Sequence, residues 1–100
     1  MQLKPVEQQV VAVVGASSGI GRQAALRFAR RGAKVVVSAR GESGLRSLVD
    51  EIHREGGEAV AVVADVAEFD QAKTIADQAA EEYGRLDTWV HLASVSLFAP

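Results

Sequence analysis

The chain has 100 residues, of which 48% are hydrophobic and 24% are charged, as is ordinary for one soluble globular domain or part of a larger one. A formal net charge of −2 gives no support for a nucleic-acid partner or a membrane-surface partner, since either usually comes with a clustered basic excess. The absence of cysteine excludes disulfides, thiolate metal sites and a cysteine nucleophile.

The two ends of the sequence bear on location and completeness. No apolar run approaches the roughly 18 residues that a membrane span needs. The start "MQLKPVEQQ" lacks the pattern of a signal peptide, so a cytoplasmic protein is expected. The chain stops at "SLFAP", directly after an apolar run, so we expect residues 1–100 to be the N-terminal part of a single longer domain.

Four short apolar runs rich in valine predict four strands. They do not alternate between apolar and polar residues, which is typical of strands that are covered on both faces in a parallel sheet. The predicted strands are Val10–Val14, Lys34–Ala39, Ala59–Ala64 and Thr88–Ala93.

Three amphipathic segments alternate with these runs and predict helices. The first is Ile20–Arg31, and apolar stripes from Leu45 to Ile52 and from Ala72 to Tyr83 mark the other two. Gly32, the pair Gly56–Gly57 and Gly84 follow the stripes, where a left-handed helix cap favours glycine. The order β-α-β-α-β-α-β predicts an α/β fold, a Rossmann-like doubly wound parallel sheet with right-handed crossovers.

The stretch "VVGASSGIGR" lies between the first predicted strand and the first predicted helix. A helix that begins there directs free N–H groups and a partial positive charge outward, which favours an anion. Gly15 permits a sharp exit from the strand, Gly19 the close approach of a pyrophosphate, and Gly21 close packing of helix on sheet. Ser17 and Ser18 add hydroxyl donors, and the missing Lys-Ser/Thr pair argues against a nucleoside-triphosphate loop.

With Ile20 between the last two glycines, "GASSGIG" resembles the cofactor loop of the short-chain dehydrogenase/reductase family. The resemblance continues through "DV" at residues 65–66, "YGRLDTWV" before the fourth strand, and "SVSLFAP". It implies an oxidoreductase that transfers a hydride between a nicotinamide cofactor and a small carbonyl or alcohol substrate. We expect no nucleic-acid or membrane partner, and a homo-oligomer when the protein is full length.

The end of the second strand, "VSAR", bears on the choice between NAD and NADP. An acidic residue there would bind a ribose diol, whereas Arg40 offers a charged fork for a 2′-phosphate, so we expect NADP, with NAD the less favoured cofactor. A solvated surface arginine is the alternative. Arg22 is a candidate helper or a solvated residue, and Glu42 is interpreted as part of the next helix entry.

Other cofactor contacts follow from the resemblance. It implies that Asp65 and Val66 contact the adenine, although Asp65 has the alternative role of a helix cap, and that main-chain contacts to the ribose survive at Ala93. Two departures from the family pattern are Val14, where threonine is usual, and the segment His91–Ser94, where Asn-Asn-Ala-Gly is usual.

No catalytic residue is assigned in this chain. The resemblance implies a tyrosine with a lysine four residues later, but Tyr83 is followed at that spacing by Asp87. We interpret His91 as a hydrogen-bonded structural residue and His53 as solvated, and no His/Asp/Glu spacing suggests a metal. The 100-residue chain alone is therefore expected to be inactive, with its fourth strand exposed as a sheet edge.

Three alternative functions remain open. A non-catalytic nucleotide-binding or regulatory module is favoured by the departure at His91–Ser94. An epimerase-like member is the second. A Rossmann-like methyltransferase is the third, and the absence of an acidic residue at Ala39 or Arg40 argues against it.

Overall fold

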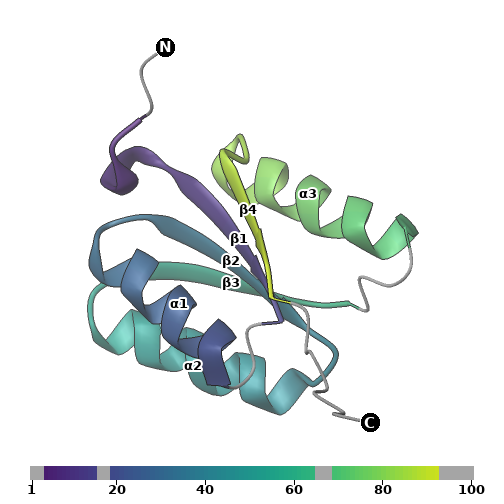
Figure 1. The fold of residues 1–100 in the computed structure, drawn as a ribbon, viewed down its shortest axis with the longest axis horizontal. Helices are drawn as coiled ribbons and strands as arrows, with labels where there is room; N and C mark the ends of the chain where they lie inside the picture. The colour runs from purple at the N-terminus through teal and green to yellow at the C-terminus, as the bar shows by residue number, and fades with distance from the viewer. Residues whose placement is uncertain (1–3, 16–18, 65–68, 93–100) are drawn as a thin grey trace, which may run out of the picture.

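A computed structural model describes residues 4–15, 19–64 and 69–92. The predictions for Ser17, Ser18, Asp65, Val66 and Ala93 lie outside the described residues. The described part contains a four-stranded sheet with helices on both faces (Figure 1), so the predicted α/β class is confirmed.

The sheet is parallel, with the strand order β3-β2-β1-β4. Its strands are β1 (Val10–Val14), β2 (Lys34–Ala39), β3 (Glu58–Val63) and β4 (Thr88–His91). β3 starts and ends one residue earlier than predicted, and β4 ends at His91 rather than at Ala93. β1 lies between β2 and β4, and its last residue, Val14, pairs with Ser38 on β2 and with His91 on β4.

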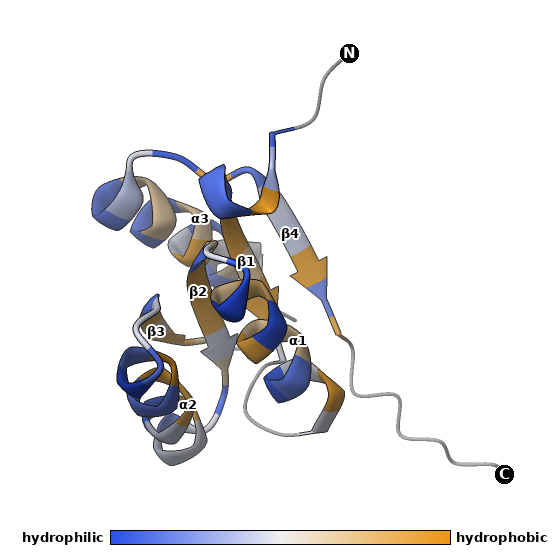
Figure 2. Cartoon of the chain, turned by 90° about the vertical axis from the view of Figure 1, so that its left-hand side faces the viewer, coloured by the Kyte–Doolittle hydropathy of each residue, from blue (hydrophilic) through white to orange (hydrophobic). Residues whose placement is uncertain are grey.

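Two helices cover one face of this sheet and one covers the other (Figure 1). The elements are α1 (Gly19–Arg30), α2 (Glu42–Arg54) and α3 (Phe69–Tyr83), and a short 3-10 turn, η1 (Val6–Gln8), precedes β1. Each face has its own apolar core, with Val11, Val13 and Leu48 in one and Val14 and Ile75 in the other. Figure 2 shows the same division, with hydrophobic strands between helices whose outer surfaces are hydrophilic.

The central and outer strands differ in burial. β1 is buried at every position and β2 at its four inner positions, as expected for strands covered on both faces. The same expectation is wrong for β3 and β4, which alternate between buried or half-buried and exposed residues. Val63 is 53% exposed and Trp89 38% exposed, because each of these strands has a neighbour on one side only in the described part of the chain.

The predicted glycine caps are found at the ends of all three helices. Gly32, Gly56 and Gly84 have φ values of 96°, 87° and 82°, which are left-handed conformations. Gly57 does not share this conformation. A Cβ there would lie 2.9 Å from Cγ2 of Ile52, so its role is close packing against α2.

Candidate functional site

Gly15 lies at the carboxyl end of β1, where the chain leaves the sheet toward α1. Its φ is 89°, and a Cβ on it would lie within 3.0 Å of the Leu92 carbonyl oxygen. The Gly15 N–H donates a 2.7 Å hydrogen bond to the Ser38 carbonyl. A side chain at this position is therefore opposed both by backbone conformation and by the end of β4.

Main-chain hydrogen bonds connect the carboxyl ends of all four strands. The Leu92 N–H donates to the Val14 carbonyl at 2.9 Å, and the Ala64 N–H donates to the Ala39 carbonyl at 3.0 Å. Together with the bond from Gly15, these contacts make one continuous edge from β3 to β4. In parallel α/β sheets this is the edge where ligands bind.

The N-terminus of α1 opens onto the same edge. Gly19 begins the helix with a φ of 60°, and a Cβ on it would meet nothing within 4 Å. Ile20 is 77% exposed, whereas Gly21 is buried. Gly19 thus places no side chain at the start of the helix, an arrangement that suits a diphosphate bound by main-chain N–H groups.

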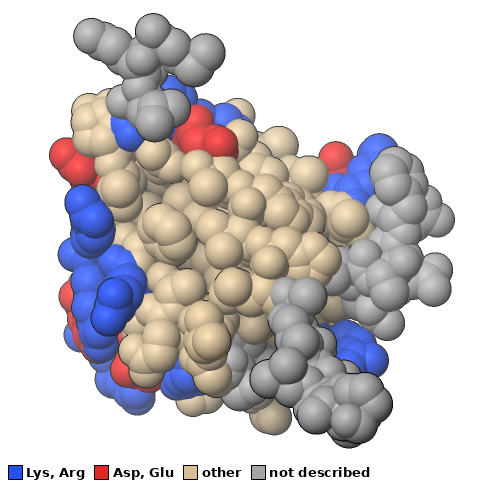
Figure 3. All heavy atoms as spheres, in the orientation of Figure 1, with Lys and Arg blue, Asp and Glu red and all other residues tan. Residues whose placement is uncertain are grey.

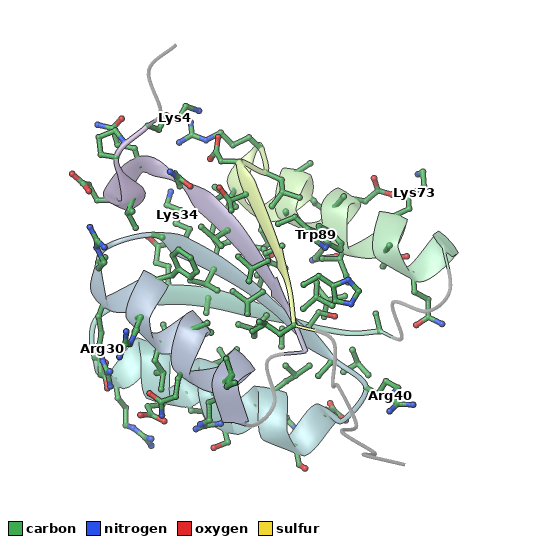
Figure 4. The ribbon with its side chains drawn as sticks, in the orientation of Figure 1. Lys4, Arg30, Lys34, Arg40, Lys73 and Trp89 are labelled. Carbon is green, nitrogen blue, oxygen red and sulfur yellow. The ribbon has the colours of Figure 1, made fainter. Side chains whose placement is uncertain are left out.

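Arg40 follows the last residue of β2 and is exposed. Within residues 4–15, 19–64 and 69–92 it has no hydrogen bond or ion pair, so its guanidinium is available to a ligand. Figure 4 shows it beyond the end of β2, on the opposite side of the view from Arg30. Glu42 is the first residue of α2, which confirms its interpretation as part of the helix entry.

Arg22 connects α1 with α2, and its contacts argue against a role for it beside Arg40 in binding a 2′-phosphate. Its guanidinium donates to Glu51 at 2.8 Å, to the Ser47 hydroxyl at 3.2 Å and to the Gly44 carbonyl at 3.4 Å. Basic and acidic side chains intermingle on the side of the molecule formed by these two helices (Figure 3). The interpretation of Arg22 as a solvated residue is therefore wrong, and its charge is taken up by Glu51.

Ser38 was not among the predicted site residues. It is fully buried in β2, and its hydroxyl is without a hydrogen-bond partner in the described part of the chain. An unpaired buried hydroxyl costs about 1–3 kcal/mol. The only signal in the sequence is a single hydroxyl in the apolar run "VVVSA", one residue before the strand ends.

Asp87 anchors β4 to β1 at the opposite end of the sheet. Its Oδ2 accepts hydrogen bonds from the Val10 N–H at 2.8 Å and from Arg85 at 3.0 Å, and its Oδ1 accepts one from Lys4 at 3.0 Å. The hydrogen bond from Val10 is the main cause that lowers the pKa of Asp87 to about 2, helped by Lys4 and Arg85. This cluster ties the residue before β4 to the first residue of β1.

Tyr83 lies far from the glycine turn, near a hollow of about 370 Å³ at the amino ends of β1 and β2. The hollow is lined by Glu7, Gln8, Gln9, Val10, Lys34, Tyr83 and Arg85. Burial, followed by the negative charges of Glu58 and Glu82, raises the pKa of Tyr83 to about 12. The phenol therefore stays protonated, and it contributes nothing to the edge that carries the candidate site.

Of the two histidines, His53 is exposed as predicted, whereas His91 differs from its predicted role. His91 is exposed on β4 and has no side-chain hydrogen bond in the part of the chain that the structure describes, so its interpretation as a bonded structural residue is wrong. His53 is exposed, but its Nε2 lies 3.2 Å from the Ala59 carbonyl. No group of three potential metal ligands occurs among the described residues, and no helix among them is long and apolar enough to cross a bilayer.

The described residues fit a nicotinamide dinucleotide. The bare Gly15 turn and the start of α1 at Gly19, which carries no side chain, suit a diphosphate, and the exposed guanidinium of Arg40 lies beyond the end of β2. The unpaired hydroxyl of Ser38 supplies a polar atom just below the same edge.

Comparison with known proteins agrees with this geometry. The chain is 45% identical over 98 residues to the uncharacterized oxidoreductase YxnA of Bacillus subtilis, and the match covers 98% of this chain and 28% of that protein. A short chain dehydrogenase from Mycobacterium avium superposes with a TM-score of 0.86 at 44% identity, over 90% of this chain and 36% of that one. The chain thus spans about a third of the length of these proteins.

Two similar structures carry different cofactors. A 7α-hydroxysteroid dehydrogenase complexed with NADH has a TM-score of 0.82 at 33% identity, over 84% of this chain and 33% of that one. An actinorhodin polyketide ketoreductase with NADPH has a TM-score of 0.81 at 34% identity, over 90% and 34%. The family model for short chain dehydrogenases matches residues 9–100. The chain belongs to the short-chain dehydrogenase/reductase family.

Proposed function

We propose that this chain binds the cofactor in an NADP(H)-dependent oxidoreductase that interconverts a small carbonyl compound and an alcohol. The bound nicotinamide supplies or accepts the hydride. The observation that carries the proposal is the turn at Gly15, which leads from a buried strand into the open N-terminus of α1. Similar proteins described as oxidoreductases support it.

The preference for NADP over NAD depends on Arg40. Its exposed guanidinium is without a partner in the described ranges and follows the strand that selects the ribose substituent. A charge-assisted hydrogen bond to a 2′-phosphate contributes about 1.5–3 kcal/mol. Structures similar to this chain contain NADH as well as NADPH, so the preference is argued from Arg40 alone.

The remaining cofactor contacts are part of the proposal. The diphosphate would be held by main-chain N–H groups and hydroxyls of the turn, and the residues involved are Gly15, Ser17, Ser18, Gly19, Ile20 and Gly21. Asp65 and Val66 would contact the adenine, and Ala93 the ribose.

We further propose that residues 1–100 form the N-terminal part of one cofactor-binding domain and do not turn over alone. By the complete protein we mean this chain together with any sequence that adjoins it in its gene. The complete protein would be cytoplasmic and homo-oligomeric.

Titration of the complete protein with NADPH and NADH tests the proposal. Trp89 lies on β4 and is 38% exposed, so its fluorescence is a suitable probe of events at the strand ends. Saturable quenching by NADPH at lower concentrations than by NADH is expected. Binding of neither cofactor would contradict the proposal.

A non-catalytic nucleotide-binding module is the second candidate. Its support is that Leu92 packs as an apolar residue against the α1/α2 core, where a polar side chain is usual in the family. This module would bind NADPH with the same affinity but show no oxidation or reduction with any carbonyl or alcohol in a broad panel. Turnover of one panel member excludes it.

A further inference from the structure

The hydroxyl of Ser38 is a buried polar atom without a hydrogen-bond partner among the described residues. Ser38 is in register with Val14 on β1 and Val62 on β3, neither of which has a polar side chain. α3 contributes Ile75 and Ala79 to the core on the face where Val14 and Val62 lie. The described neighbours of Ser38 therefore leave its hydroxyl unpaired.

The position of Ser38 relates this hydroxyl to the candidate site. Ser38 is the last residue but one of β2, and its carbonyl accepts the hydrogen bond from the Gly15 N–H at 2.7 Å. Arg40, the proposed partner of the 2′-phosphate, lies two residues further along the same strand end. The hydroxyl is thus in the first buried layer beneath the edge where the adenosine half of the dinucleotide would bind.

We propose that the Ser38 hydroxyl hydrogen-bonds to the adenosine part of the bound dinucleotide, directly or through one water. This inference rests on the proposed function, since it assigns a further residue to the same cofactor site. Alanine would occupy nearly the same space without a polar atom. The Ser38 oxygen lowers the folding stability of the cofactor-free protein, because it is buried without a partner, and it raises the affinity for the cofactor, because it gains a partner there.

Ser38→Ala separates these two effects in the complete protein. The melting temperature of the cofactor-free variant is expected to rise by about 2–4 °C, as the removal of one unpaired buried group predicts. Its Kd for NADPH, measured by calorimetry, is expected to weaken about tenfold, a loss typical of one hydrogen bond. A purely structural residue would not move these two quantities in opposite directions.

Two further variants serve as controls. Ser38→Cys keeps the shape of the side chain but replaces the hydroxyl with a somewhat larger thiol, which is only a weak donor, so it is expected to lose nearly as much NADPH affinity as alanine. Ser47→Ala removes the hydroxyl that accepts from Arg22 on α2, away from the strand ends, and should leave the Kd unchanged.

The outcomes are distinct. Unchanged NADPH affinity in Ser38→Ala would mean a buried water alone satisfies the hydroxyl, and it would overturn the inference while the proposed function stands. A lower melting temperature of the free Ser38→Ala variant would mean that the hydroxyl already has a partner, which also overturns it. Failure of the unmodified protein to bind NADPH or NADH would instead contradict the proposed function.

Discussion

The carbonyl oxygen of Leu92 occupies the space into which any side chain on Gly15 would project, within 3.0 Å of an added Cβ. The two residues are 77 positions apart in the sequence, yet they meet because Leu92 donates its N–H to Val14, the residue before Gly15. The end of β4 thus presses against the turn that starts the candidate cofactor site.

Gly15→Ala is expected to destabilise the chain by about 2–4 kcal/mol, because it combines a left-handed φ with a clash against the Leu92 carbonyl. Gly19→Ala is the matched control. Its φ is also positive, but its Cβ would meet nothing within 4 Å, so the expected loss is about 1 kcal/mol. Urea unfolding measures the free energy of unfolding of both variants. Equal decreases would contradict the prediction, because they would show that the Leu92 carbonyl moves aside at no cost in stability.

Arg40→Asp is expected to shift the cofactor preference from NADPH toward NADH, because a carboxylate repels a 2′-phosphate and accepts hydrogen bonds from a ribose diol. We expect the NADPH affinity to fall at least tenfold, and the ratio of Kd values for the two cofactors measures the change. Arg46→Asp, an equal charge change at an exposed residue of α2, should leave the ratio unchanged. An unaltered ratio in Arg40→Asp would refute the assignment.

The Asp87 carboxylate makes folding stability depend on pH in the acid range. Its pKa is lowered from 3.8 to about 2, so its contribution is present above about pH 4 and is lost as the pH falls toward 2. Asp87→Asn is expected to remove about 1 kcal/mol at neutral pH, after allowance for solvent screening, and to flatten stability between pH 4 and 2.

Urea midpoints at several pH values measure this effect. Asp77→Asn is the control, since Asp77 pairs with Lys73 on the exposed surface of α3 and should change stability by less than about 0.5 kcal/mol. The same pH profile in Asp87→Asn and the unmodified chain would contradict the role of Asp87.

The ion pair between Arg22 and Glu51 is expected to couple α1 to α2. A double-mutant cycle with alanine should give a coupling free energy of about 1 kcal/mol, because the side chains are only 24% and 31% exposed. The pair of Lys73 and Asp77, at 66% and 65% exposure, should give about 0.3–0.5 kcal/mol. A coupling near zero for Arg22 and Glu51 would show that this ion pair does not hold the two helices together.

Local patterns in the sequence were sufficient for the order of the elements. Valine-rich runs without alternation predicted β1 and β2, and apolar stripes at helical spacing predicted α1, α2 and α3. The edge position of β4 was predicted, but the cover of both faces was wrongly expected for β3 and β4, because the position of a strand within a sheet depends on which strands become its neighbours. Val63 and Trp89 are apolar in sequence and exposed in the fold for this reason.

Roles that depend on contacts between distant residues were out of reach. The role of Arg22 could not be predicted because its ion-pair partner, Glu51, is distant in the sequence. The exposure of His91 could not be predicted because it depends on which elements pack over β4. The unpaired hydroxyl of Ser38 could not be found, because its apolar surroundings come from β1, β3 and α3.

By itself the sequence determined the alternation of strands and helices and the placing of small residues at the first strand-to-helix turn, since both depend on neighbours within a few positions. Only the tertiary structure decided that the Leu92 carbonyl closes over Gly15, that Glu51 neutralises Arg22 and that the Ser38 hydroxyl is buried unpaired. These relations depend on strand order and register, which bring together parts of the chain that no local pattern connects.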